Sequence, residues 1–233
     1  MVVATVYLIP TVLAEDGYYA IPEYVQEAIQ QCQIFFAENE RTTRRYFKSL
    51  WKEMVIDQYE WHTIGKAEPA VLSHFAKAVK DGKTIGIVSD AGCPGVADPG
   101  QVLVARAHEL GATVKPLVGP SSVLLALMAS GLNGQCFRFC GYLPIDAALR
   151  RKALAKLEEV ALAQNCTQLF IETPYRNDQL LTDILASCKP TTRLCIAADV
   201  TGAQEFVQTN TILGWRTNKP TLHKRPAIFL LGK

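Results

Sequence analysis

The 233-residue chain lacks several features that would assign it at once to a common class of protein. No apolar run reaches the roughly 18 residues of a membrane-spanning helix. The N-terminus lacks the basic segment of a secretory signal, and Pro10 interrupts the first apolar stretch. With 49% hydrophobic and 20% charged residues, the composition also differs from that of a disordered chain. We therefore expect a cytoplasmic globular protein with a substantial core and no membrane partner.

Metal-binding and nucleotide-binding signatures are missing as well. The seven cysteines are scattered without a Cys-x-x-Cys pair, which argues for reduced thiols and against a metal site. We interpret Cys136 and Cys140 as small buried apolar residues. Neither Gly-x-x-x-x-Gly-Lys-Ser/Thr nor Gly-x-Gly-x-x-Gly occurs, which excludes a Walker A loop and the standard dinucleotide fingerprint. The net charge of +2 produces no global field for nucleic acid, so any such contact requires local patches.

Strand and helix patterns alternate along the chain. Apolar runs predict strands at 4–9, 34–37, 84–88, 113–117, 137–140, 168–172, 193–198, 205–209 and 227–231. Amphipathic spacing, caps and stops predict helices from about 22, and at 41–54, 69–80, 99–111, 121–131, 147–163 and 180–188. The alternation predicts an α/β fold with mostly parallel sheets. A change of rhythm near Val118 divides it into two α/β sub-domains, 1–118 and 119–233.

Three connections that follow predicted strands are candidates for ligand binding, because α/β sheets bind ligands at the carboxyl ends of strands. In the glycine- and proline-rich segment 89–100, Asp90 can accept hydrogen bonds from a ligand, or the aspartates only cap the following helix. In the segment 116–122, Ser121 can cap a helix and also contact a ligand. In the segment 170–176, Glu172 is either a buried or cleft carboxylate or a surface residue paired with Arg176.

A basic stripe suggests a nucleic-acid contact. Helical spacing places five cations on one face: Arg41, Arg44, Arg45, Lys48 and Lys52. The opposite face is apolar through Phe47, Leu50, Trp51 and Met54. Such a surface suits phosphate groups, although a solvated face neutralised by neighbouring glutamates is the alternative. A second basic stretch carries the same two interpretations: Arg216, Lys219, His223, Lys224 and Arg225.

Several segments together resemble one known family in order and spacing. They are Ser-Asp-Ala-Gly-Cys-Pro-Gly-Val-Ala-Asp-Pro-Gly at 89–100, Gly-Pro-Ser-Ser at 119–122, Ala-Ser-Gly-Leu at 129–132, Phe-Cys-Gly-Tyr-Leu-Pro at 139–144 and Glu-Thr-Pro-Tyr-Arg at 172–176. The chain resembles the tetrapyrrole (corrin/porphyrin) methylase superfamily. It is most similar to the bacterial branch that methylates a ribose 2′-hydroxyl of small-subunit ribosomal RNA, whose Ala-Glu-Asp-Thr-Arg segment is similar to residues 37–41.

The resemblance implies a homodimer that binds S-adenosylmethionine in a cleft between two α/β sub-domains and methylates ribosomal RNA. Cofactor-binding positions carried over from the family are Pro10, Asp90, Gly92, Cys93, Ser121, Ser122, Glu172, Val200, Pro226 and Ala227. A ribose hydroxyl reacts faster once a general base removes its proton. The candidate bases are Glu172, Glu38 and Asp90, and catalysis by positioning alone is the alternative.

The chain departs from the family pattern in two segments. The glycines of the family's first turn are missing at 8–14, and an arginine and a lysine of a later segment are missing at 198–202. These departures are those of a divergent paralogue. They leave two other functions open: methylation of a tetrapyrrole or another small molecule, and a cofactor-binding module that contacts RNA without catalysis.

Overall fold

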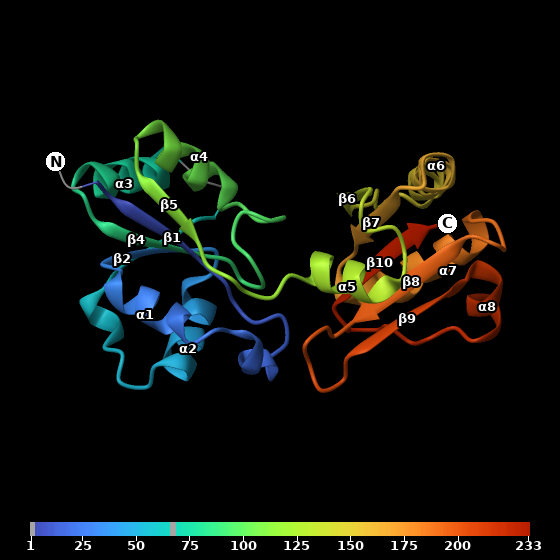
Figure 1. Ribbon diagram of the computed structural model, residues 1–233, viewed down its shortest axis with the longest axis horizontal. Coiled ribbons are helices and arrows are strands. Elements are labelled where there is room, and N and C mark those ends of the chain that lie inside the picture. The colour runs from blue at the N-terminus through green and yellow to red at the C-terminus, as the bar shows by residue number, and fades with distance from the viewer. Residues whose placement is uncertain (1–2, 66–68) are drawn as a thin grey trace. The chain divides into compact units, whose positions relative to one another are not determined.

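The computed structural model describes residues 3–65 and 69–233. The chain divides into two compact units, Met1–Pro120 and Ser121–Lys233, each built around its own five-stranded sheet (Figure 1). The α/β fold class predicted from the sequence is confirmed. Within the described residues, no helix is long and apolar enough to span a membrane.

The sheet of the first unit is entirely parallel, with the strand order β3-β2-β4-β1-β5. Its strands are β1 (Thr5–Ile9), β2 (Ile34–Ala37), β3 (Glu60–Thr63), β4 (Thr84–Val88) and β5 (Thr113–Pro116). Because every strand runs in the same direction, all five carboxyl ends lie along one edge of the sheet. The connections that leave these ends are therefore neighbours in space.

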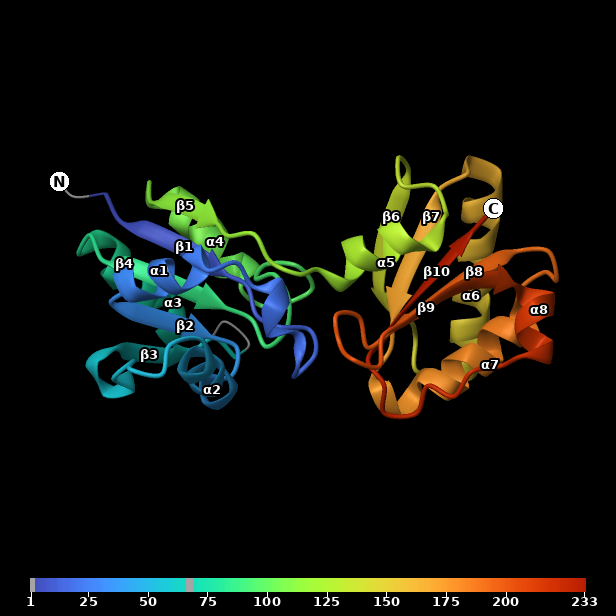
Figure 2. The same cartoon turned by 60° about the horizontal axis from the view of Figure 1, so that its bottom comes forward.

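Helices cover both faces of this sheet, as Figures 1 and 2 show. One face carries α1 (Tyr24–Gln31) and α2 (Glu40–Leu50), and the other carries α3 (Pro69–Lys80) and α4 (Gln101–Glu109). Successive strand residues point to opposite faces. Phe35 accordingly packs on the ring of Phe47 in α2, whereas Phe36 packs on the ring of Phe75 in α3. Two short 3₁₀ helices, η1 (Gly17–Ala20) and η2 (Ile56–Gln58), complete the unit.

The second unit has a mixed sheet with the order β6-β7-β10-β8-β9. Its strands are β6 (Phe137–Tyr142), β7 (Thr167–Ile171), β8 (Arg193–Ala198), β9 (Phe206–Thr211) and β10 (Ala227–Gly232). Only β6 and β7 pair in parallel, and the other three pairs are antiparallel. The expectation of mostly parallel sheets is therefore wrong for this unit. The short turn from β8 to β9 forms a hairpin, for which no crossover helix is needed.

Helices also cover both faces of the second sheet. On one face, α5 (Ser122–Ser130) packs against residues of β7, β8 and β10. On the other lie α6 (Ala147–Gln164), α7 (Asn177–Ser187) and α8 (Ile212–Thr217), and the 3₁₀ helix η3 (Pro174–Arg176) precedes α7.

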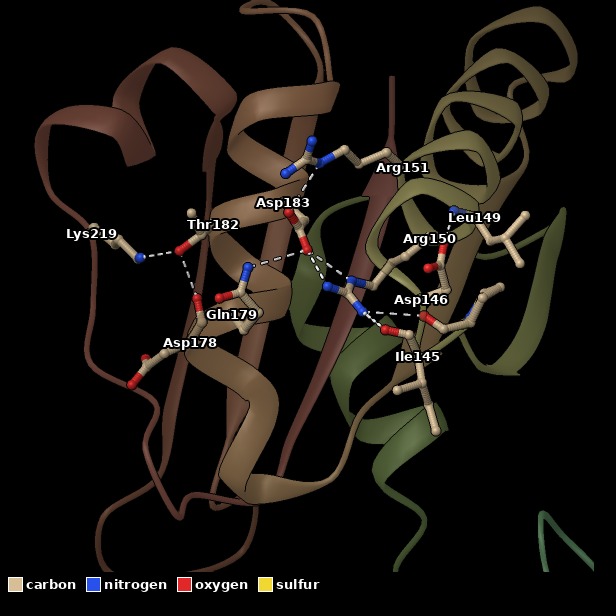
Figure 3. Close-up of polar contacts among 11 residues, drawn as sticks. Ile145, Asp146, Leu149, Arg150, Arg151, Asp178, Gln179, Thr182, Asp183 and Lys219 are labelled. Carbon is tan, nitrogen blue, oxygen red and sulfur yellow. Dashed lines mark hydrogen bonds and ion pairs between the residues drawn. The ribbon is translucent and has the colours of Figure 1, made fainter.

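A buried ion cluster joins two of these helices (Figure 3). Arg150 of α6 is 5% exposed, and its Nε donates to Oδ2 of Asp183 in α7 over 2.8 Å. The same guanidinium donates to the carbonyl of Ile145 over 2.6 Å. Arg151 and Gln179 add contacts to the same carboxylate. The cluster fixes both helices and the connection that leads into α6.

Two helix boundaries near the predicted ligand loops differ from the prediction. The helix expected over 41–54 ends at Leu50, so Trp51 and Met54 lie beyond it. The helix expected to begin at Pro99 begins at Gln101. Asp98 instead accepts hydrogen bonds from the loop amides of Gly95 and Gly100, over 2.8 and 2.6 Å. The carboxylate thus stabilises the loop itself and is not the N-cap of α4.

Two short secondary-structure elements and the exposure of Cys136 were not predicted. β3 and α8 were not predicted, because four and six residues are too few to give a clear periodic pattern. Cys136 is exposed and Cys140 is half-buried, so the interpretation of this pair as buried apolar residues is wrong. Cys136 precedes β6, whose first residues are exposed to solvent.

Candidate functional site

The central strands of the first sheet bring three predicted positions to one edge. Pro10 follows β1, Glu38 follows β2, and Asp90 follows β4 after the buried Ser89. The order β2-β4-β1 makes these strands direct neighbours, so the three connections leave the sheet side by side. Thr11 links two of them, since its hydroxyl donates to the carbonyl of Ser89 over 3.2 Å.

Hydrogen bonds join the end of β2 to the loop after β4. Oε2 of Glu38 accepts from the backbone amide of Asp90 over 2.9 Å. The Thr42 hydroxyl donates to Oδ1 of Asp90 over 3.3 Å. Asn39 begins α2 by accepting from the amides of Arg41 and Thr42, over 3.1 and 3.3 Å. The start of α2 and the Asp90 loop therefore form one connected unit.

Burial raises the pKa of the Glu38 carboxyl above its ordinary value of 4.5. The negative charges of Asp90 and Asp98 raise this pKa further, while the bond from the Asp90 amide opposes the shift. The group is half-buried and faces two other carboxylates across the loop. This edge of the sheet consequently carries a concentration of negative charge.

A pocket of about 350 Å³ opens at this edge. Its lining includes Thr11, Tyr18, Thr42, Arg45, Tyr46 and Asp90. The rings of Tyr18 and Tyr46 lie 6.2 Å apart and 27° from parallel. Tyr46 is buried, and its hydroxyl donates to the carbonyl of Pro10 over 2.7 Å. The pocket thus combines a fixed aromatic wall with hydroxyl groups, a carboxylate and a guanidinium.

Gly92 and Cys93 lie on a different part of the same loop. The amide of Thr11 donates to the carbonyl of Gly92 over 2.9 Å, and Gly92 has a φ of +72°. The Cys93 thiol approaches the carbonyl of Pro120 to 3.5 Å, in the connection that follows β5. A Cβ on Gly119 would lie 2.1 Å from Cβ of Pro10, so only glycine fits there. The first and last connections of this unit therefore pack on each other.

In the second unit, the predicted positions also gather at one edge of the sheet. Strand register pairs Ala227 with Ala198 and Ile228 with Ile171. Glu172, Val200 and Pro226 extend from these pairs at the same edge. The sequence patterns could not give this neighbourhood, because it depends on antiparallel pairing of β10.

Ser121 and Ser122 open α5 in this unit. The other end of α5 lies at the start of β8, where Arg193 donates to the Gly131 carbonyl over 3.4 Å. Its first turn packs in one cluster with Val200, beyond the end of β8. Ser121 is the N-cap residue, but its side chain makes no capping hydrogen bond, so the prediction of a capping hydroxyl is wrong.

Glu172 is buried, as the first of its two interpretations predicted, and it also pairs with Arg176, so only the surface position of the second interpretation is wrong. Its side chain accepts from Arg176 over 2.6 Å and from the amide of Thr173 over 2.7 Å. Burial alone would raise its pKa, but these hydrogen bonds and the charge of Arg176 outweigh burial and lower it. A stabilised carboxylate of this kind is a poor proton acceptor.

The turn after β8 holds an unpartnered buried hydroxyl. Asp199 and Thr201 have φ values of +49° and +70°, which is costly for residues with side chains. Asp199 pairs with Arg225 over 2.5 Å, and the Thr201 amide donates to Glu205 over 2.7 Å. Thr201 is 7% exposed, and its Oγ1 has no hydrogen-bond partner among the residues that the structure describes. A strained turn with an unsatisfied polar atom beside Val200 fits a ligand with polar groups.

Two members of the basic stripe on α2 are engaged within the fold. Arg44 pairs with Glu40, and its guanidinium lies 5.1 Å above the Trp61 ring. The Lys48 ammonium donates to the carbonyl of Met54 over 3.0 Å.

The predicted five-residue stripe on one helix face is therefore wrong. Lys52 lies beyond the end of α2 at Leu50. Arg41 and Arg45 are exposed on the helix, and of these two Arg45 lines the pocket.

The second basic stretch is largely engaged in contacts of its own unit. Arg216 donates to the carbonyl of Leu185 over 2.7 Å, near the end of α7. Lys219 donates to the Thr182 hydroxyl over 2.6 Å, and Arg225 is held by Asp199. Across residues 3–65 and 69–233, no group of three or more His, Cys, Asp or Glu side chains is placed to hold a metal ion.

The fold is that of known methyltransferase structures. The crystal structure of the methyltransferase CobJ matches 100% of this chain and 95% of its own with a TM-score of 0.64 and 16% identity. A uroporphyrin-III-C-methyltransferase from Thermus thermophilus matches 98% of this chain and 94% of its own, with a TM-score of 0.57 and 17% identity.

The family model of the tetrapyrrole (corrin/porphyrin) methylases matches residues 20–213. The chain belongs to this family, as its sequence motifs predicted.

Curated relatives point to one branch. A Ribosomal RNA small subunit methyltransferase I from Micromonospora olivasterospora is 32% identical over 78% of this chain and 55% of the relative. Its namesake from Mesorhizobium japonicum is 31% identical over 80% of this chain and 60% of the relative. The Buchnera aphidicola protein of the same name is 27% identical over 97% of this chain and 76% of the relative. The matched chain thus spans little more than half the length of the first two.

Proposed function

We propose that this chain is an S-adenosylmethionine-dependent methyltransferase that modifies a ribose 2′-hydroxyl of small-subunit ribosomal RNA. The main support is that several relatives named Ribosomal RNA small subunit methyltransferase I match between 78% and 97% of the chain. The family match and the motifs carried over from this branch agree with it. We further propose that the protein acts as a homodimer in the cytoplasm.

Both units supply residues to cofactor binding in this proposal. In the first unit these are Pro10, Asp90, Gly92 and Cys93, on connections that pack on one another. In the second they are Ser121, Ser122, Glu172, Val200, Pro226 and Ala227. The unpartnered Thr201 hydroxyl beside Val200 supports a polar ligand at the second edge.

S-adenosylmethionine, when bound, would supply a sulfonium-activated methyl group for transfer to the ribose oxygen. The protein must hold the hydroxyl in line and accept its proton. We assign the role of general base, which accepts the proton of the ribose hydroxyl, to the Asp90 carboxylate, because it lines the pocket. Glu38 is a positioning residue, because it holds the Asp90 amide over 2.9 Å. Glu172 is the least suited of the three carboxylates because Arg176 neutralises it.

The pocket disfavours a polycarboxylate tetrapyrrole as the acceptor. Among the described residues, its walls include Glu15 and Asp90 and one guanidinium, that of Arg45. A ligand with several carboxylates would meet two negative groups here without matching cations. A ribonucleotide brings hydroxyl donors for the carboxylates and one phosphate for the arginine.

Methyl transfer from radiolabelled S-adenosylmethionine to unmethylated small ribosomal subunits tests the function. We expect label in the RNA at a ribose oxygen, and a loss of about 10²–10⁴ in rate with Asp90→Asn. Calorimetry of the same variant separates its two assigned roles. Unchanged cofactor affinity with a slower rate assigns the carboxylate to proton transfer. Cofactor binding without transfer to RNA would instead indicate a non-catalytic module, and transfer to a tetrapyrrole would refute the assigned substrate.

A further inference from the structure

We propose that the 350 Å³ pocket of the first unit binds the acceptor as a single ribonucleotide turned out of its strand. The proposal rests on the proposed function, since it names the part of the RNA that one site takes. The volume lies near the lower end of the range for small-molecule sites, roughly 300–1,000 Å³. One nucleotide unit, and not a helical segment, matches this scale.

The aromatic wall supplies a surface on which a base can stack. Tyr46 is buried and tied to the Pro10 carbonyl over 2.7 Å, so its ring is fixed. Tyr18, in η1, lies nearly parallel to it at 6.2 Å. Proteins that bind unpaired RNA commonly stack bases on such rings. Tyr18 thus offers a half-buried ring, backed by the fixed ring of Tyr46, on which a base can stack.

The polar groups of the pocket suit the rest of a nucleotide. Asp90 and the exposed Glu15 accept hydrogen bonds from ribose hydroxyls or a base amine. Arg45 is exposed at the pocket, and among the described contacts its guanidinium has no acidic partner. A guanidinium in this situation is suited to bind one phosphate. Arg45 can therefore pair with one phosphate of the bound nucleotide.

The pocket is distinct from most cofactor positions. Of the four positions assigned to the cofactor in this unit, Asp90 alone lines it. Gly92 and Cys93 turn toward the connection after β5, on the other side of β1. The pocket instead lies beside α2, between β1 and the start of that helix. Asp90 therefore stands where a cofactor loop meets an acceptor pocket, which is where a transferred group must pass.

The test is a fluorescence anisotropy titration of the whole chain with a short labelled single-stranded oligoribonucleotide. We expect Arg45→Gln to weaken RNA binding about ten-fold, and to reduce the salt dependence by about 0.7 in log–log slope, the value for one phosphate. Tyr18→Ala should weaken binding about ten-fold through loss of stacking, whereas Tyr18→Phe retains it. The matched deoxyribo-oligonucleotide should bind more weakly than the RNA.

Arg41→Gln is the matched comparison, because Arg41 lies one turn earlier on α2 and outside the pocket lining. Its effect on RNA binding should be several-fold smaller than that of Arg45→Gln. S-adenosylmethionine affinity, measured by calorimetry, should be the same in the wild type and in Arg45→Gln. Thermal unfolding of each variant separates a lost contact from a damaged fold.

Equal losses for Arg41→Gln and Arg45→Gln would overturn the proposal in favour of a diffuse basic surface. Loss of cofactor affinity in Tyr18→Ala or Arg45→Gln, with an intact fold, would show that the pocket holds the cofactor. A wild-type chain that binds no RNA would also refute it. The methyl-transfer assay distinguishes this inference from the proposed function. If the wild type methylates small subunits but Arg45→Gln leaves RNA binding unchanged, only this inference is refuted. If the variants change RNA binding as expected but no methyl group is transferred to RNA, only the proposed function is refuted.

Discussion

The Glu38 side chain holds the backbone of Asp90, with Oε2 of Glu38 accepting from the Asp90 amide over 2.9 Å. The two residues are separated by 52 positions in the sequence but follow adjacent parallel strands. A residue at the end of β2 therefore controls the path of the loop after β4. Glu38 therefore acts on the site through the backbone amide of Asp90.

Replacing Glu38 tests this role. Glu38→Gln keeps an oxygen that can accept from the Asp90 amide, so we expect activity close to that of the wild type. Glu38→Ala removes the acceptor and should lower the methyl-transfer rate roughly ten- to a hundred-fold through misplacement of Asp90. A rate for Glu38→Gln as low as that for Glu38→Ala would show that the charge itself is required, which contradicts a positioning role.

The raised pKa of Glu38 has a consequence for stability. Its folded-state pKa lies above the ordinary value of 4.5, so the protonated form stabilises the folded state and this contribution is lost as the pH rises through the folded pKa. As the pH is lowered from neutral to about pH 4, the free energy of unfolding of the wild type should therefore increase relative to that of Glu38→Gln. Urea unfolding at both pH values measures the difference. A relative loss of stability at acid pH would contradict the direction of the shift.

Thr201 provides a test of the cofactor contacts proposed for the second unit. Its hydroxyl is buried without a partner, so Thr201→Val should leave the unfolding temperature of the free protein unchanged or higher. The same variant should weaken S-adenosylmethionine binding by about five- to ten-fold, the effect of one lost hydrogen bond. Thr201→Ser keeps the hydroxyl and should keep the affinity. Calorimetry showing wild-type affinity for Thr201→Val would refute a contact with the cofactor.

The buried pair of Arg150 and Asp183 predicts a strong effect on folding. Asp183→Asn leaves the Arg150 guanidinium buried without its counter-charge, which should cost about 3–5 kcal/mol in free energy of unfolding at pH 7. Arg150 and Gln179 outweigh burial and lower the pKa of Asp183 below its ordinary 3.8. The contribution of the ionised Asp183 carboxylate to the free energy of unfolding is therefore present above pH 3.8 and is lost as the pH falls through the folded-state pKa. The difference between wild type and variant should shrink in acid, as urea titrations can show.

Arg44 should behave as a structural residue and not as an RNA contact. Its guanidinium lies above the Trp61 ring and pairs with Glu40. We expect Arg44→Gln to lower the free energy of unfolding by about 0.5–1 kcal/mol while changing RNA affinity less than Arg45→Gln does. Unfolding and anisotropy titrations of the two variants make the comparison. If Arg44→Gln weakened RNA binding as much as Arg45→Gln does, the prediction would fail and a broader basic RNA-binding surface on α2 would be supported.

Much of the first unit could be predicted from the sequence, because its central strands β1, β2 and β4 are largely buried and appear as continuous apolar runs. β2, β4 and α3 have the bounds that the patterns predicted. Asp90 was identified as a candidate because it stands at the end of such a run, and Glu38 because it lies in a segment that resembles the family. Their mutual hydrogen bond depends on strand order, which local patterns do not contain.

Contacts between distant residues account for what sequence patterns missed. Helical spacing placed Arg44 and Arg45 together on a basic face, but Trp61 on β3 determines that only one of them is engaged. The antiparallel pairing of β10 brings Ala227 beside β8, although the alternating rhythm favoured parallel strands. The strained turn at Thr201 has no local signal either, since neither of its positive φ values falls on glycine.

The junction between β2 and α2 performs three tasks within five residues: Glu38 secures a distant loop, Asn39 starts a helix, and Thr42 reaches the carboxylate of that same loop. Inserting or deleting a single residue here would rotate the helix relative to the strand and detach all of these links at once. Length variation among homologues should consequently spare this junction.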